Sequence, residues 1–143
     1  MTQPGLMQIF PELVDKLRRS GDESRHRIVE RACLLAVQRA DVAAPTLTEA
    51  LDVIHRRSFG VPDLRSQVDG LAQELDEIAW DIQDRIGTGG ATEAEYRRAF
   101  VKARAAAAIG FALDGSLSAS FDSLYEAYCA IGSRDDYMSV IAD

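Results

Sequence analysis

The apolar positions between Pro62 and the glycine-rich stretch 87–90 recur with the period of an α-helix. They are spaced three or four residues apart, which at about 100° per residue places them on one narrow stripe. Asp63, directly after Pro62, can cap the start, and the glycines can end it. We therefore expect an amphipathic helix over 63–86. Its stripe consists of Leu64, Val68, Leu71, Leu75, Ile78, Ile82 and Ile86.

A second strong pattern follows over residues 92–114. Thr92 and Glu95 form a capping box, in which a hydroxyl and a carboxylate satisfy backbone donors of the first turn. From Ala105 to Leu113 the chain is apolar on every side, which is typical of a helix surrounded by others. We therefore expect this Ala-rich helix to form the centre of the core.

The remaining helices are expected to be shorter. The predicted set comprises a first helix over 6–19 kinked at Pro11, one over 23–40 capped by Asp22, one over 45–58, one from Ser116 or Ser118 to about 131, and a short one after Ser133. No useful stretch alternates as a strand would. The 143 residues are thus expected to fold as a single compact all-α domain, 1–143, with five to seven helices.

Charge is unevenly distributed along the chain. The formal net charge is −7, and the acidic excess lies in residues 63–143, whereas residues 1–62 are nearly balanced. An acidic field opposes non-specific binding to DNA, so nucleic acid is not the favoured partner. It suits a basic protein partner, or serves solubility alone. We expect the early arginines to pair with the acidic helix 63–86 within the molecule.

Cysteines and the N-terminus add further bounds. Cys33 and Cys129 have no metal-binding spacing, so free thiols are expected, with one long-range disulfide left open. The first residues lack the pattern of a signal peptide, and the longest apolar run is too short to cross a bilayer. These features favour a cytoplasmic protein with no membrane partner and no cofactor.

Two alternative functions rest on other residue patterns. His26 and His55 each lie three residues after an acid, Glu23 and Asp52, as in helical-bundle metal centres of enzymes or sensors. On a helical wheel both acids point away from the apolar side, which weighs against such a centre. Further carboxylates for it could come from Glu74, Asp76, Glu77, Asp81 and Asp84. Alternatively, residues 23–58 could form a helix-turn-helix regulator that binds DNA.

Trp80, the only tryptophan, falls about 160° from the apolar stripe of its own helix. An exposed aromatic ringed by carboxylates has the composition of a protein-binding hot spot. The competing interpretation is that the N-terminal helix packs over the indole. The expected partner-binding residues are Trp80, Gln73, Asp76, Glu77 and Asp84.

Residues 71–130 resemble a loosely defined group of small all-helical bacterial proteins, some of them grouped with the immunity proteins of toxin systems. The likeness is carried by Leu75-Asp76-Glu77, by 92–100, by 103–106 and by Glu126-Ala127-Tyr128. The resemblance favours an immunity-like inhibitor, and the acidic second half, the outward Trp80 and the lack of a recognisable set of catalytic residues in the sequence point the same way. We therefore predict a non-enzymatic interaction module, immunity-like, that binds a basic protein partner, with self-association left open.

Overall fold

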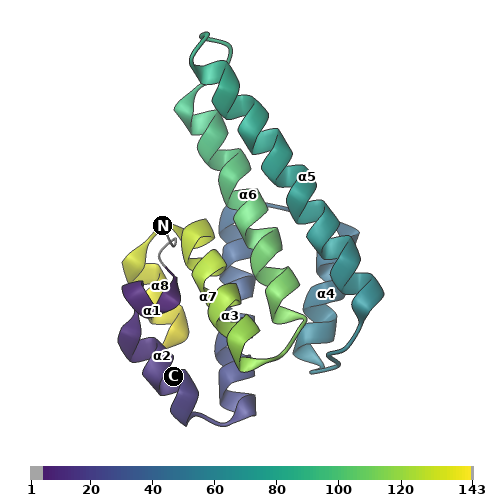
Figure 1. The fold of residues 1–143 in the computed structure, drawn as a ribbon, viewed down its shortest axis with the longest axis vertical. Helices are drawn as coiled ribbons and strands as arrows, with labels where there is room; N and C mark the ends of the chain where they lie inside the picture. Colours follow the sequence, from purple (N-terminus) through teal and green to yellow (C-terminus); the bar gives the residue numbers. More distant parts are fainter. Residues whose placement is uncertain (1–4, 143) are drawn as a thin grey trace.

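The computed structural model describes residues 5–142, and these form eight α-helices (Figure 1). This confirms the all-α class, with more helices than the five to seven expected. The helices are α1 (Leu6–Ile9), α2 (Pro11–Arg19), α3 (Asp22–Ala40), α4 (Pro45–His55), α5 (Pro62–Ile86), α6 (Glu93–Ala112), α7 (Leu117–Ile131) and α8 (Arg134–Ile141). The expected first helix is two helices, because the chain turns at Phe10 and restarts at Pro11, which favours the first helical position.

Several helix starts are capped by the side chains that the sequence indicates. Thr92, Ser116 and Ser133 each accept a hydrogen bond from the backbone N–H three residues later. Asp22 and Asp63 were expected as caps, but both lie inside the first turn, where their charge still favours the helix dipole. The helix expected over 45–58 ends at His55.

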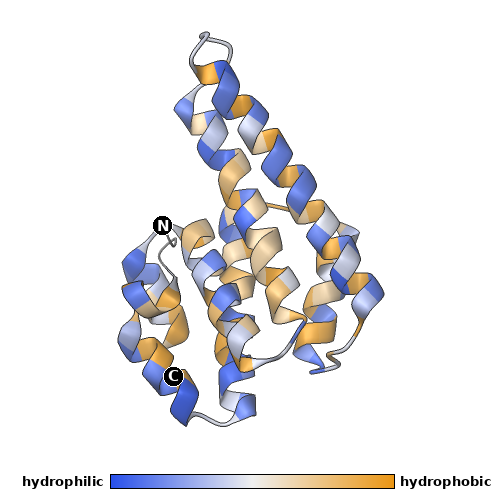
Figure 2. Ribbon diagram, in the orientation of Figure 1, coloured by the Kyte–Doolittle hydropathy of each residue, from blue (hydrophilic) through white to orange (hydrophobic). Residues whose placement is uncertain are grey.

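Helix α6 lies at the centre of the core, as its composition predicts. It packs against α5, α7, α3 and α4 (Figure 1). Its C-terminal half is buried among these neighbours and appears in Figure 2 as a hydrophobic segment inside the body. The buried residues of this half are mainly small: Ala103, Ala105, Ala106, Ala108, Ile109, Gly110 and Ala112. Small side chains let the helix axes approach closely, so this one helix can contact several others.

The two ends of the chain meet in an aromatic cluster. The Phe10 ring lies 4.9 Å from Tyr128 and 5.0 Å from Tyr137, centroid to centroid. The hydroxyl of the fully buried Tyr137 donates a hydrogen bond of 2.9 Å to the carbonyl of Leu124. Helices α1 and α2 thus pack on α7 and do not cover Trp80. The interpretation in which the N-terminal helix buries the indole is wrong.

Helices α5 and α6 extend beyond the body as a two-helix hairpin (Figure 1). We call residues 73–102 the arm. All of them are described by the structure, and Ala79 is the only buried one. The apolar stripe of α5 is accordingly buried only at its start: Leu64 and Val68 lie in the core, whereas Ile78 is 53% exposed. The predicted helix is present, but its apolar stripe is not fully covered, because only α6 packs against α5 along the arm.

Candidate aromatic groove between α5, α6 and α7

Trp80 stands on the surface of the arm and is 55% exposed. Of its expected companions, Gln73, Glu77 and Asp84 are also exposed, and they occupy the same side of α5 by helical spacing. Asp76 differs from the prediction. Its carboxylate is only 23% exposed and binds Arg104 of α6, so it belongs to the base of a groove rather than to an exposed rim.

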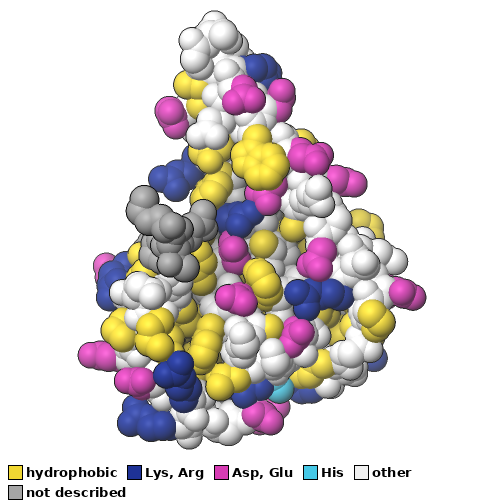
Figure 3. Space-filling model, in the orientation of Figure 1, with side chains coloured by type: hydrophobic (Ala, Val, Ile, Leu, Met, Phe, Trp, Pro, Cys, Tyr) yellow, Lys and Arg dark blue, Asp and Glu magenta, His cyan; other side chains and the backbone are white. Residues whose placement is uncertain are grey.

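A groove of about 640 Å³ opens beside Trp80, between α5, α6 and α7. We call it the aromatic groove. On this face of the molecule, hydrophobic side chains on the arm are interspersed with acidic and basic ones (Figure 3). The lining residues are Asp76, Ala79, Trp80, Tyr96, Phe100, Arg104, Tyr125, Glu126 and Cys129. The groove thus combines aromatic walls with charged groups from three helices.

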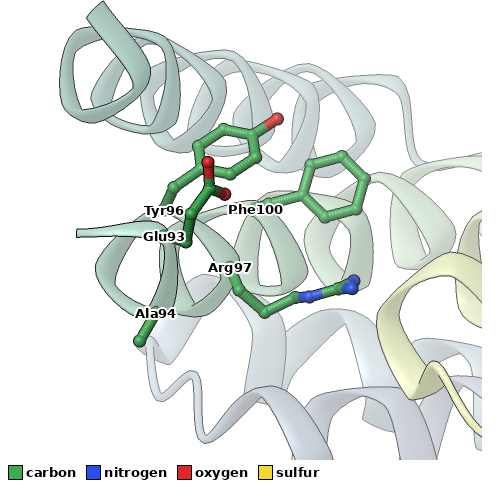
Figure 4. A pocket seen from close by; sticks show the side chains of 5 residues that line it. All are labelled: Glu93, Ala94, Tyr96, Arg97 and Phe100. Atoms are coloured by element: carbon green, nitrogen blue, oxygen red, sulfur yellow. The ribbon is translucent and has the colours of Figure 1, made fainter. Parts of the chain in front are cut away.

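The groove continues along α6 toward the tip of the arm. Tyr96 and Phe100 line both the groove and a second hollow of about 480 Å³ beside Glu93, Ala94 and Arg97. Their ring centroids are 5.9 Å apart, and Figure 4 shows the rings side by side with the charged Glu93 and Arg97 around them. An extended segment of a partner could therefore contact aromatic surface along several turns of the arm.

Three charged side chains form a cluster at the base of the groove. Arg104 donates to Glu126 at 2.8 Å and to both carboxylate oxygens of Asp76, the Oδ2 contact being 2.7 Å. The Arg104 guanidinium also lies 5.7 Å from the centre of the Phe100 ring. Its Nε is buried and has no hydrogen-bond partner. One arginine between two carboxylates leaves this cluster with a formal charge of −1.

Burial shifts the protonation equilibria of the cluster. It raises the pKa of Glu126 above its ordinary value, although Arg104 opposes the rise. Burial lowers the pKa of Arg104, but Glu126 and Asp76 outweigh this and hold it above its usual range. Asp122, one turn before Glu126 on α7, also has a raised pKa because it is partly desolvated. Because the two carboxyls at the base share one arginine and burial disfavours their charged form, a further cation would stabilise them.

The groove chemistry suits binding better than nucleophilic catalysis. Cys129 is its only thiol, and burial raises the pKa of that thiol, which keeps it protonated and weakly reactive. The carboxylates of Asp76 and Glu126 are both held by Arg104. Aromatic faces beside carboxylates attract cations through the ring quadrupole and through charge.

The two histidines do not meet in a metal centre. His26 Nε2 lies 3.0 Å from the carbonyl oxygen of Gly115, and the ring packs on Phe59. His55 Nδ1 lies 2.7 Å from Glu30. Among residues 5–142 no three His, Cys, Asp or Glu side chains are placed to hold a metal ion. The structure therefore gives no support to the alternative built on His26 and His55.

The acids expected beside the histidines have arginine partners instead. Arg57 binds Glu23 at 3.1 Å and Glu30 at 2.9 Å, and Arg56 binds Asp52 at 2.8 Å. The pairing expected between the early arginines and the acidic helix is therefore wrong for these side chains. Helices α3 and α4 supply both partners locally, so the charges are matched at that end of the molecule.

Arg25, one of the early arginines, is buried at the base of the body and does not pair with helix α5. It is only 7% exposed and donates hydrogen bonds to Asp22, to the hydroxyl of Ser120 and to the carbonyl of Gly115. This arginine joins the start of α3 to the start of α7. It is thus a structural residue and not part of a nucleic-acid contact.

Helix α4 has no basic surface of the kind that the helix-turn-helix alternative requires. The exposed side of this helix carries Glu49 and Asp52, and Asp52 is the ion-pair partner of Arg56, which directly follows the helix. Such a surface would not neutralise phosphates.

Within the described part of the chain, no helix is both long enough and apolar enough to span a bilayer.

Most of the groove is invisible in the sequence pattern. Tyr96, Phe100 and Arg104 are spaced four residues apart on α6, so their common side could have been inferred from helical periodicity. Tyr125 and Glu126 come from α7, and their approach depends on how three helices pack. No local pattern carries that information.

Comparisons with known proteins do not change this picture. No family model, no curated protein and no solved structure matches the chain. The resemblance to immunity proteins therefore stays a prediction, and the function is argued from the groove itself.

Proposed function

We propose that this protein is a non-enzymatic interaction module whose aromatic groove binds a basic segment of a partner protein, in the manner of an immunity-like acidic inhibitor. The observation that carries the proposal is an exposed indole, Trp80, beside a groove whose base holds more carboxylate than cation. An aromatic anchor with a charged rim is the usual composition of an interface hot spot.

The expected complex follows from the placement of these groups. An arginine or lysine of the partner would lie against Trp80, Tyr96 or Phe100, with its charge directed to Asp76 and Glu126. Glu77 and Asp84 lie outside the groove on the same side of α5 and would accelerate the encounter. The charges favour association, and burial of the indole slows dissociation.

The test uses a fluorescently labelled peptide rich in arginine and lysine, and an acidic peptide of equal length. Trp80 is the only tryptophan, so its emission reports directly on the groove. We expect the basic peptide to shift that emission and to bind with an affinity that falls as salt rises. The acidic peptide should leave the emission unchanged.

Trp80→Ala should weaken binding of the basic peptide by about tenfold or more, as measured by the anisotropy of its label. Met138→Ala is the matched control, because Met138 is 45% exposed on α8, away from the arm. Equal binding of the two peptides, or equal affinity of the two folded variants, would show that the groove does not bind a basic partner.

A further inference from the structure

The arm has a second apolar surface on the side away from the aromatic groove. Ile78 and Trp80 are two residues apart on α5, hence about 200° apart around the helix. Ile78 is 53% exposed beside a hollow of about 330 Å³. We call this surface the aliphatic face; it is lined by Leu75, Ile78, Ile82, Glu95, Arg98, Ala99 and Lys102.

Two helices alone cannot bury this surface. A helix that is apolar over a wide arc needs neighbours on all of that arc, and along the arm α5 has only α6. Leu75 and Ile82 are accordingly only partly buried. A second hairpin stacked on the aliphatic face would complete a four-helix bundle, which is the common way in which antiparallel helix pairs cover such stripes.

Charge on the two helices of the arm is of opposite sign. Along the arm, α5 carries five acidic residues and one arginine, whereas α6 over 93–102 carries three basic residues and two acidic ones. The same holds at the edges of the aliphatic face. The α5 edge has Glu74, Asp81 and Arg85, a net charge of −1, and the α6 edge has Glu95, Arg98 and Lys102, a net charge of +1. The charges of the aliphatic face are thus complementary to those of a second copy of the same face, so neither a basic nor an acidic partner is required.

We propose that the aliphatic face binds a second copy of this chain, with α5 of each copy lying on α6 of the other. This arrangement is an isologous two-fold pairing, in which each contact occurs twice. Arg104 lies beside Asp76, and Gly110 lies against Asp69, so Asp81 is level with Arg98 on the antiparallel helices. With the two-fold axis along the arm, Asp81, which pairs with Arg85 of its own helix at 3.3 Å, faces Arg98 of the other copy. Pairing α5 with α5 would instead place acid against acid.

The first experiment measures mass by light scattering and sedimentation over a wide concentration range. We expect a concentration-dependent dimer for the unaltered chain. Ile78→Glu should reduce dimerisation at least a hundredfold, because it places two carboxylates in the apolar contact. Met138→Glu, at an exposed apolar position on α8, is the matched control and should dimerise normally. A monomer at every concentration, or a dimer unaffected by Ile78→Glu, would overturn the proposal.

The second experiment tests the arrangement of the helices. Asp81→Arg and Arg98→Asp should each weaken the dimer about tenfold, because each creates a like-charge contact twice. The double variant restores opposite charges and should recover the dimer. Absence of recovery would refute the pairing of α5 with α6. Trp80→Ala should leave dimerisation unchanged, which separates this proposal from the function assigned to the aromatic groove.

Discussion

Replacement of Arg104 by methionine removes the cation from the base of the aromatic groove and keeps most of the side-chain volume. Asp76 and Glu126 would then be left without their shared partner, at 23% and 16% exposure. Breaking a buried ion pair costs about 3–5 kcal/mol, and partial exposure reduces the penalty. We expect Arg104→Met to lower the free energy of unfolding by about 2–3 kcal/mol at neutral pH, which corresponds to a fall in Tm of roughly 7–10 °C.

The penalty should depend on pH with a definite sign. The pKa of Glu126 is already raised by burial, and loss of Arg104 would raise it further. A carboxyl whose pKa is higher in the folded state takes up its proton more readily when folded, so acid favours the folded form. The difference between variant and unaltered protein should therefore shrink as pH falls from 7 to about 5. Adding Glu126→Gln to Arg104→Met should recover part of the loss at neutral pH.

These differences in the free energy of unfolding are measured by urea unfolding, with the loss of helix followed by far-ultraviolet circular dichroism. Arg97→Met is the matched control, because Arg97 is an exposed arginine on the same helix. It should change the stability by less than about 0.5 kcal/mol. Equal effects of Arg97→Met and Arg104→Met, or a penalty at Arg104 that does not change with pH, would refute the view that Arg104 neutralises two partly buried carboxylates.

Two further predictions concern the body of the molecule. Gly115 has φ of +78°, and a Cβ there would lie 2.8 Å from the Phe59 ring, so Gly115→Ala should cost about 2–4 kcal/mol in urea unfolding. Gly132→Ala, with φ of +73° and open space around it, should cost only about 1 kcal/mol, and similar losses at both sites would contradict the clash. Burial raises the pKa of Cys33 to about 11 and also raises that of the less buried Cys129. A thiol reagent should therefore modify Cys129 slowly in the folded protein and Cys33 only after unfolding, whereas simultaneous rapid labelling would refute this order.

Local patterns in the sequence were sufficient to predict that the chain is helical and where most of the helices lie. The capping residue Thr92 and the all-round apolar run after Ala105 correctly indicated the start of α6 and its central place. The predicted helix boundaries were wrong where two neighbouring residues fitted the pattern equally well as the first residue of the helix. Pro62 itself occupies the first turn of α5, so Asp63 lies inside the helix. Periodicity also showed which side of α5 is apolar, but it carried no information on whether a neighbour covers Ile78.

The site was predictable only as far as one helix determines it. The angle between Trp80 and the apolar stripe correctly indicated an outward indole. Asp76 is close to Trp80 on a helical wheel, yet its position is decided by Arg104, which comes from another helix. Glu126 joins them from α7, after the chain has reversed twice. Such encounters depend on packing between distant segments, which no local spacing encodes.

The slender cross-section of the arm bears on how its length could vary. Because residues 80–102 contain no buried side chain, their number is not constrained by the packing of the body. Seven residues added to α5 and seven to α6 would preserve the hydrophobic register and move the loop outward by roughly 10 Å. The distance between the loop and the body is thus a quantity that insertions or deletions could adjust in steps of two helical turns, with the rest of the protein acting as an unchanged anchor.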